Sequence, residues 1–331
     1  ATVSGVQPNV PEDVKLEPAA AVDSAVRSTE TLLAGHDAGL PADLLILPET
    51  VFPAPIDPIR ARGFAGRPDI YGWVASLNRR TGAAVLFGAI GVEDRGPDEW
   101  DQFNSAYLVD GRRGNRARYD KRRLVPAVER LPFLDPDWFG RAAFFGGFEV
   151  GRSADPLPLG AESFGVLICF ESIFAELSRD YRRRGADFLV NITNDAWFGR
   201  EGPWWRRTAA LWQHPSHLTL RAIENRIGIA RIANTGVSGT VDPLGRWRHT
   251  TRLFEPSIFT AELLTTEGLT LFARTGDVVG WLAALAAALG IAMPRVRHRP
   301  APAGSGAAGG DGRGRDITVP ESAGRESAGA D

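Results

Sequence analysis

Short apolar runs alternate with helix-forming segments along most of the chain, and this alternation restricts the fold more than any other feature. Two of the runs, "LLILP" at 44–48 and "VLIC" at 166–169, carry no polar side chain apart from the terminal thiol. Strands that are covered on both faces by other layers have such continuous apolar runs. The sequence therefore predicts a layered α/β domain.

Eight segments have the length, the Val, Ile and Leu content and the flanking Gly, Pro, Asp or Asn residues that are typical of strands. They are 3–10, 43–49, 83–93, 104–110, 164–170, 186–195, 227–234 and 236–242. Helices are predicted over 12–36, 67–81, 172–184 and about 215–226, the last with Pro215 in its first turn. Together these strands and helices predict one domain, the catalytic domain, over residues 1–265.

The segment 278–293, "VVGWLAALAAALGIAM", contains no charged residue. Its length is close to the roughly 17–25 residues of a membrane-spanning helix. Trp281 lies near one end and the basic "RVRHR" follows the other, an arrangement typical of a span whose C-terminal end is cytoplasmic. We expect one transmembrane helix within a connector at 266–294. The alternative is a buried core helix.

The C-terminal residues 295–331 begin with basic residues and continue rich in Gly, Ala and charge, which predicts a disordered tail. At the other end, "ATVSGVQPNV" has no features of a signal peptide and is typical of a strand already begun. This start suggests that the chain is the C-terminal part of a longer protein.

Composition excludes several classes of function. The net charge of −2 provides no basic surface for nucleic acid. The single cysteine, Cys169, excludes an intrachain disulfide framework and any CxxC site. No His, Cys and carboxylate cluster has metal-ligand spacing, so we expect neither a metal nor a cofactor.

Three predicted strand ends each present one ionisable residue: Glu49, Lys121 and Cys169. Ligands of layered α/β proteins bind at the carboxyl ends of strands, so these side chains are candidates for one site. Each also has a plainer interpretation. Glu49 could be a surface carboxylate, Lys121 part of a solvated basic run, and Cys169 a small apolar residue of the core.

The three residue types complement one another chemically. A thiol that attacks a carbonyl needs a base for its proton, which a desolvated carboxylate can be, and a cation for the oxyanion. A Cys–His pair has poor support, because His214 and His217 flank Pro215 and the other histidines lie away from strand ends.

The sequence around these residues resembles the nitrilase (carbon–nitrogen hydrolase) superfamily and, within it, the apolipoprotein N-acyltransferase family. The similar blocks, in order, are "PETVFP", "YDKRRLVPAVERLPF", "CFES", "TNDAWFG", "WQHPSHLTLRAIENR", "RIANTGVSG" and "LTLFARTGD". They extend from about Val3 to the apolar helix. Two blocks depart from the family pattern: "VPAVE" replaces "VPFGE", and "CFE" replaces "CYE".

The resemblance implies a four-layer α-β-β-α sandwich on the periplasmic side of the bacterial inner membrane. It implies that Glu49 is the general base, Lys121 the oxyanion stabiliser and Cys169 the nucleophile. By the same resemblance, the supporting residues are Glu129, Glu171, Asn194 and Trp197. From the residues alone, Glu171 could instead cap a helix, and Asn194 and Asp195 could be ordinary turn residues.

The function implied by the resemblance is transfer of a fatty acyl chain from a phospholipid such as phosphatidylethanolamine, through a Cys169 thioester. The acceptor is the α-amino group of the diacylglyceryl-cysteine at the N-terminus of an apolipoprotein. The N-terminal membrane helices of that family are missing from this chain. Residues 200–211, "REGPWWRRTAAL", are predicted to be an amphipathic arm that meets lipid headgroups, or else an ordinary surface insertion.

Two other functions remain open. One is a soluble carbon–nitrogen hydrolase, an amidase or nitrilase acting on a small amide, which would use the same three residues. The apolar segment 278–293 favours the membrane enzyme over it. The other is an inert nitrilase-like interaction module, which the presence of Glu49, Lys121 and Cys169 together disfavours.

Overall fold

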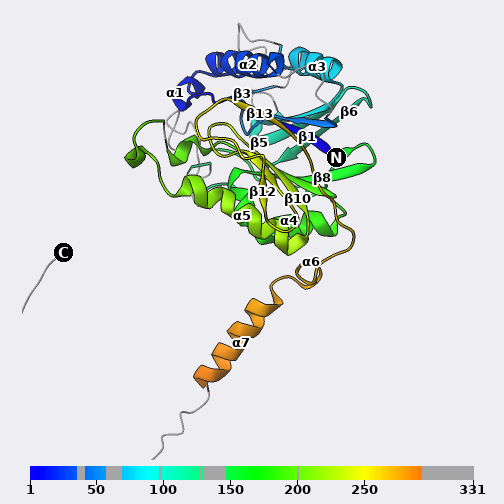
Figure 1. Cartoon of the computed structure of the whole chain (residues 1–331), viewed down its shortest axis with the longest axis vertical. Helices are drawn as coiled ribbons and strands as arrows, with labels where there is room; N and C mark the ends of the chain where they lie inside the picture. Colours follow the sequence, from blue (N-terminus) through cyan, green and yellow to red (C-terminus); the bar gives the residue numbers. More distant parts are fainter. Residues whose placement is uncertain are drawn as a thin grey trace, which may run out of the picture. The chain divides into compact units, whose positions relative to one another are not determined.

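The computed structural model describes residues 1–35, 42–56, 69–96, 99–126, 128–129, 147–199 and 201–292. The chain divides into two units, residues 1–281 and the segment from Leu282 onward. The first unit contains two β-sheets, one seven-stranded and one six-stranded (Figure 1).

The first sheet mixes parallel and antiparallel pairing. Its order is β13 (Ser257–Glu262), β1 (Thr2–Gln7), β2 (Leu44–Ile46), β4 (Ala84–Gly96), β5 (Glu99–Asp110) and β6 (Asn115–Asp120), with β3 (Phe52–Pro55) also paired to β4. Strands β1, β2 and β4 are parallel neighbours, whereas β13, β5 and β6 run antiparallel to the strands beside them. The carboxyl end of β2, where Glu49 follows, therefore lies between parallel strands.

The second sheet has three parallel strands at its centre. Its order is β12 (Trp247–Arg248), β11 (Gly239–Val241), β10 (Gly228–Ala233), β9 (Phe188–Thr193), β8 (Glu162–Ile168) and β7 (Leu157–Leu159). Strands β8, β9 and β10 are parallel, so their carboxyl ends lie at one edge of the sheet. Cys169 directly follows β8 and Asn194 directly follows β9.

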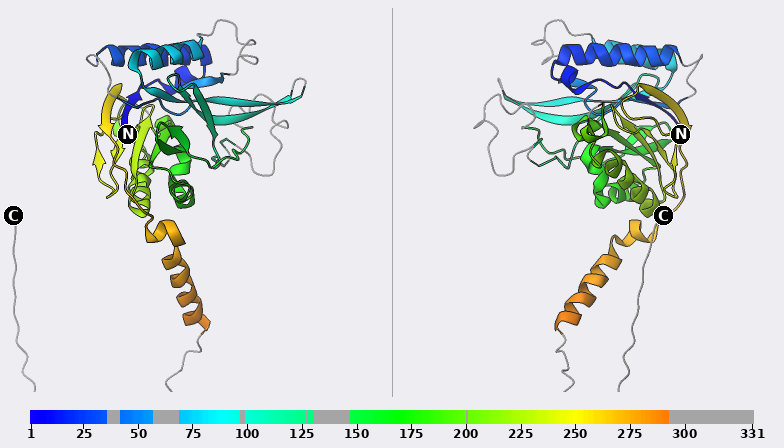
Figure 2. Two further views of the ribbon diagram at one scale, coloured as in Figure 1. Left: turned by 90° about the vertical axis from the view of Figure 1, so that its right-hand side faces the viewer. Right: turned by 60° about the vertical axis from the view of Figure 1, so that its left-hand side comes forward.

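Helices cover the outer face of each sheet (Figures 1 and 2). Helices α2 (Pro18–Ala34) and α3 (Ile70–Thr81) lie over the first sheet, and α4 (Ala175–Arg183) and α5 (Ala210–Asn225) over the second. The shorter elements are α1 (Glu12–Lys15), α6 (Leu271–Thr275) and the 3₁₀ turns η3 (Cys169–Ile173), η4 (Asp195–Phe198) and η5 (Trp204–Arg206). This arrangement confirms the predicted α-β-β-α sandwich.

Two hydrophobic clusters hold the layers together, and β2 contributes to both. Leu44 and Ile46 belong to the cluster that includes the second sheet, whereas Leu45 packs in the cluster that includes α2 and α3. Successive residues of a strand point to opposite faces, so a strand buried on both faces is apolar at every position. All three side chains are fully buried, which explains the continuous run that predicted this layering.

The eight predicted strands each overlap an observed strand, but some boundaries were wrong. The strand predicted over 164–170 ends at Ile168, because Cys169 has a positive φ of 49° and cannot continue it. The helix predicted over 12–36 is two helices, with Pro18 in the first turn of the second. Four strands, β3, β7, β12 and β13, were not predicted, and β6 was predicted only as the strand end before Lys121, without bounds.

Helix α5 begins at Ala210, five residues before the predicted start at Pro215. Proline lacks an N–H and so leaves one helical hydrogen bond unmade, which favours the first turn but does not require it. Here Leu211 and His214, on the N-terminal side of Pro215, are buried, and their packing extends the helix past the proline. Pro215 therefore lies inside the helix.

Helix α7 (Val278–Ala292) has 15 residues and no charged side chain. Among the described residues, no helix combines the length and the hydropathy that crossing a bilayer takes. The predicted span at 278–293 extends past the last described residue, and the predicted basic and disordered tail at 295–331 lies outside the described residues altogether.

Candidate active site

Glu49 lies in the turn after β2, and the residue is 6% exposed. The backbone of this turn rests directly on Gly88 of β4. A Cβ added to Gly88 would lie 2.4 Å from the Thr50 nitrogen and 2.7 Å from the Glu49 Cα. Glycine at this position lets the turn approach the strand closely enough for Glu49 to point into the site.

Replacing Gly88 by alanine is therefore expected to displace Glu49. A misplacement of about 1 Å at a reacting group can lower a rate by about 10²-fold, and we expect a loss of that order in any reaction of this site that uses the Glu49 carboxylate. The matched control is Gly35→Ala, where the nearest atom to the added Cβ is 3.7 Å away. Equal rates in the two variants would show that the turn does not depend on Gly88.

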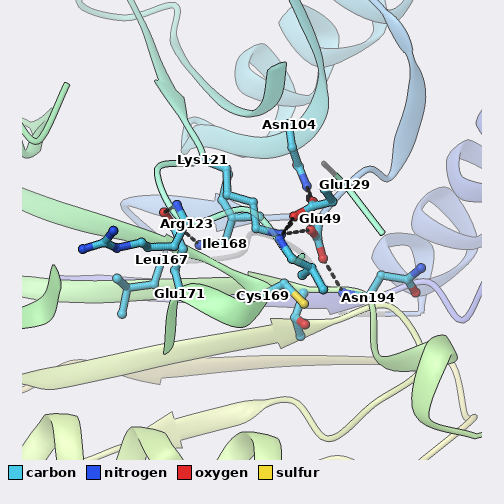
Figure 3. A network of polar contacts seen from close by, with 12 residues as sticks. Glu49, Asn104, Lys121, Arg123, Glu129, Leu167, Ile168, Cys169, Glu171 and Asn194 are labelled. Carbon is cyan, nitrogen blue, oxygen red and sulfur yellow. Dashed lines mark hydrogen bonds and ion pairs between the residues drawn. The ribbon is translucent and has the colours of Figure 1, made fainter. Parts of the chain in front are cut away.

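Lys121 directly follows β6 and is 1% exposed. Its Nζ donates to Glu129 Oε1 at 2.8 Å and to Glu49 Oε1 at 3.3 Å (Figure 3). Burial by itself would lower the pKa of Lys121, but the negative charges of Glu49 and Glu129 outweigh it and hold that pKa above its ordinary value. The ammonium is therefore permanently charged at neutral pH.

Asn104, in the middle of β5, joins the same two carboxylates and was not predicted. Its Nδ2 donates to Glu49 Oε1 and to Glu129 Oε1, each at 2.8 Å, and its carbonyl accepts the Lys121 N–H at 2.9 Å. The available signal was a single asparagine inside an otherwise strand-forming segment. Because it donates to both carboxylates, Asn104 fixes the distance between them.

Cys169 begins η3 and is 9% exposed, with its thiol beside Lys121 and Glu49 (Figure 3). Burial, together with the charge of Glu49, raises the pKa of the thiol to about 12, although Lys121 acts in the opposite direction. The resting side chain is thus a neutral thiol. It needs a base to become a nucleophile, and the neighbouring Glu49 carboxylate can serve as that base.

Glu171 is fully buried and turned away from this cluster into backbone and tyrosine donors (Figure 3). Tyr119 donates its hydroxyl to both carboxyl oxygens at 2.8 and 2.9 Å, and the N–H groups of Ile168, Arg122 and Arg123 complete the set at 2.7–3.1 Å. Burial raises the pKa of Glu171 despite these hydrogen bonds. The side chain ties the backbone after Lys121 to the backbone before Cys169.

The remaining predicted residues lie at the edge of this group. The Asn194 N–H donates to Glu49 Oε2 at 2.9 Å, and the Asn194 side chain donates to Glu12 at 3.0 Å. Trp197, on η4, is 51% exposed, and its predicted place in the lining of the site stays a prediction. His214 contacts the carbonyl of Cys169 at 3.0 Å. In the described part of the chain, no three His, Cys, Asp or Glu side chains are grouped to hold a metal ion.

Comparison with known proteins agrees with this architecture. An apolipoprotein N-acyltransferase of Geobacter metallireducens is 34% identical over 302 residues, and one of Bradyrhizobium diazoefficiens is 34% identical over 304 residues. The alignments cover 89% and 86% of this chain but 55% and 52% of the relatives. The chain therefore spans about half the length of the curated relatives it matches.

Solved structures show the same fold at low sequence identity. A carbon–nitrogen hydrolase superfamily protein from Xanthomonas campestris superimposes with a TM-score of 0.54 at 20% identity, covering 86% of this chain and 96% of that one. An amidase from Nesterenkonia sp. gives 0.50 at 20% identity, over 86% and 95% of the two chains. The carbon–nitrogen hydrolase family model matches residues 3–267, nearly the whole two-sheet unit, and so this chain belongs to that family.

Proposed function

We propose that this chain is the catalytic part of an N-acyltransferase that completes bacterial lipoproteins. Cys169 would take a fatty acyl chain from the sn-1 ester of a phospholipid and pass it to the α-amino group of an N-terminal diacylglyceryl-cysteine. The observation that carries the proposal is the buried Lys121 ammonium, held between Glu49 and Glu129 beside the single cysteine. The similarity to curated apolipoprotein N-acyltransferases supports the choice of substrates.

In the first half-reaction, the Cys169 sulfur attacks the ester carbonyl while Glu49 takes the thiol proton. This proton transfer is needed because the pKa of the thiol is raised to about 12 and almost none is ionised at neutral pH. Negative charge develops on the former carbonyl oxygen, and the positive Lys121 ammonium, which is already in place, stabilises it. When the carbon–oxygen bond breaks, Glu49 returns its proton to the leaving lysophospholipid.

In the second half-reaction, the α-amino group attacks the thioester carbonyl. Glu49 takes a proton from the attacking nitrogen and returns it to the Cys169 sulfur as the carbon–sulfur bond breaks. The enzyme is regenerated and the product is an amide. Glu129 and Asn104 take no proton in this scheme, and they hold Lys121 and Glu49 in place.

We further propose that the chain works at the bacterial inner membrane, with the two-sheet unit on the periplasmic side. Trp204 and Trp205 support contact with lipid, because they are 80% and 68% exposed and indole rings favour the headgroup region. The uncharged α7 supports an apolar contact with the membrane, and its 15 described residues are fewer than the roughly 20 that a crossing takes. Arg207, by contrast, lies over the Phe254 ring, with its guanidinium carbon 5.4 Å from the ring centroid. This residue therefore packs on the protein surface and is not part of a free arm.

The test is the intact mass of the purified chain after incubation with phosphatidylethanolamine vesicles. The expected result is a fatty-acyl increment that hydroxylamine removes and that a Cys169→Ala variant does not acquire. Adding a diacylglyceryl-cysteine peptide should then discharge the enzyme and yield the acylated peptide. Absence of the increment, combined with hydrolysis of small amides that depends on Cys169, would replace the proposal with the amidase alternative.

A further inference from the structure

A second group of buried charges lies against the backbone of Cys169 and has no part in the scheme above. It consists of Asp195, His214 and Arg231, which are 0%, 6% and 0% exposed. They come from η4, α5 and β10, three elements that are separated in the sequence. Charged groups buried this completely are costly unless they are paired, so their arrangement requires an explanation.

The contacts form a chain that ends at the nucleophile. Arg231 Nη2 donates to Asp195 Oδ2 at 2.6 Å, and Asp195 Oδ1 lies 3.0 Å from His214 Nδ1. On the other side of the ring, His214 Nε2 lies 3.0 Å from the carbonyl oxygen of Cys169. The Cys169 carbonyl and the Asp195 carboxylate only accept hydrogen bonds, so this geometry calls for a proton on each ring nitrogen, with Nδ1 donating to Asp195 and Nε2 donating to Cys169. The other polar neighbours of the ring are Ser172 Oγ, 3.1 Å from Nε2, and Arg231 Nη2, 3.2 Å from Nδ1.

The state of Asp195 agrees with this direction of donation. Burial would raise the pKa of Asp195, but the charge of Arg231 and the contact with His214 outweigh it and lower that pKa to about 2. Asp195 is therefore a carboxylate at any working pH. An acceptor fixed at Nδ1 holds the ring plane, and the ring plane sets the direction in which Nε2 donates.

Cys169 itself needs such a restraint. Its φ of 49° lies in the left-handed region, which is strained for a residue with a Cβ and is held only where the surroundings enforce it. A hydrogen bond to the Cys169 carbonyl fixes the peptide plane that follows the residue. With that plane fixed, rotation about the Cys169 backbone cannot swing the thiol away from Glu49 and Lys121.

We propose that His214 is a positioning residue for Cys169: oriented by Asp195 and Arg231, it donates from Nε2 to the Cys169 carbonyl and keeps the nucleophile in its left-handed conformation. It acts through the backbone and takes no proton from the thiol. This inference rests on the proposed function only in taking Cys169 as the nucleophile, and it holds for any acyl donor.

Two amide substitutions separate this role from general packing. The side-chain nitrogen of glutamine can occupy the place of Nε2, so His214→Gln keeps a donor for the Cys169 carbonyl. The nitrogen of asparagine can occupy only the place of Nδ1, so His214→Asn keeps the contact with Asp195 and loses the one with Cys169. The same two substitutions at His217, on the same helix and without a contact to Cys169, are the matched controls.

The probe is p-nitrophenyl butyrate, an activated ester that needs no lipid surface, with thermal unfolding measured alongside. We expect kcat to fall by about 10²-fold in His214→Asn, by less than about tenfold in His214→Gln, and KM to change little in both. Equal losses in the two variants, a loss confined to KM, or no loss would overturn the proposal. Incubation with phosphatidylethanolamine vesicles is a separate experiment. If the vesicles give no acyl-enzyme although the ester is hydrolysed, the proposed function fails and the positioning role stands.

A measurement on the unaltered protein covers the case in which neither variant folds. With isotope-labelled histidine, nuclear magnetic resonance reports which ring nitrogen of His214 carries a proton. We expect a proton on Nε2 in the resting enzyme. A bare Nε2 in the resting enzyme could not donate to the Cys169 carbonyl, and that result would overturn the proposal by itself.

Discussion

Replacing Glu49 by glutamine is expected to lower the rate of acyl-enzyme formation by about 10²–10⁴-fold, because the variant has no base for the thiol proton. The same change should make the thiol easier to ionise. The charge of Glu49 raises the pKa of Cys169, whereas the charge of Lys121 lowers it. Removing the Glu49 carboxylate takes away the first effect and leaves the second, so the pKa of Cys169 should fall. The variant is thus expected to have more thiolate and less activity.

The measurement is a pH titration of the thiolate by ultraviolet absorbance, with Cys169→Ala as the blank that removes the tyrosine signal. Since Cys169 is the single cysteine, the difference reports on one group. In the unaltered protein the midpoint should lie near the raised pKa of about 12, and in Glu49→Gln it should lie below that value. An unchanged or higher midpoint would mean that Glu49 does not act on the thiol.

Glutamine at position 49 also has a structural cost that the design must account for. Glu49 accepts from Asn104 through Oε1 and from the Asn194 N–H through Oε2. An amide has one oxygen, so one of these donors loses its acceptor, at a cost of about 1–3 kcal/mol. Thermal unfolding of the variant therefore has to accompany the activity measurement.

The layered fold was predictable because its signal is local. Residues such as Leu44, Leu45 and Ile46 are buried whichever face of β2 they occupy, so the covering of both faces is visible in one short run. The strands that were missed lack such a local signal. β13 pairs with β1, which lies at the other end of the unit in the sequence, and β12 consists of two residues, too few to show an alternating pattern.

The candidate site was predictable only where it coincides with a strand end. Glu49, Lys121 and Cys169 each come just after a strand, whereas Asn104 lies in the middle of β5 and carries no such mark. The left-handed conformation of Cys169 has no sequence signal either, because glycine is the residue that usually indicates it. His214 was considered as a base for the thiol, and the structure shows it bound to the carbonyl of the same residue.

Replacing Lys121 by methionine is expected to affect both stability and catalysis. The variant leaves Glu49 and Glu129 buried without their cation, a situation that typically costs about 3–5 kcal/mol of unfolding free energy. Loss of the oxyanion partner should lower the rate of acyl-enzyme formation by a further 10²–10³-fold, about the effect of removing one such donor. Chemical denaturation and the intact-mass assay measure the two effects separately.

The double variant Lys121→Met/Glu129→Gln distinguishes the effect on stability from the effect on catalysis. It removes one carboxylate together with the cation, so the unfolding free energy is expected to recover in part, while acyl-enzyme formation stays as low as in the single variant. Recovery of the rate along with stability would show that Lys121 serves only to balance buried charge. Persistent instability would mean that the loss does not arise from the unpaired Glu129.

The pH dependence of the stability difference follows from the pKa of Lys121. Because that pKa is raised above its ordinary value of 10.5, the folded protein binds the proton more tightly than the unfolded chain does. The stabilising contribution of the charge is therefore complete below the ordinary value and is lost as the pH rises toward the folded one. The gap in unfolding free energy between the unaltered protein and Lys121→Met should stay constant from neutral pH up to about pH 10 and narrow above it. A gap that narrows already between neutral and weakly alkaline pH would contradict a permanently charged Lys121.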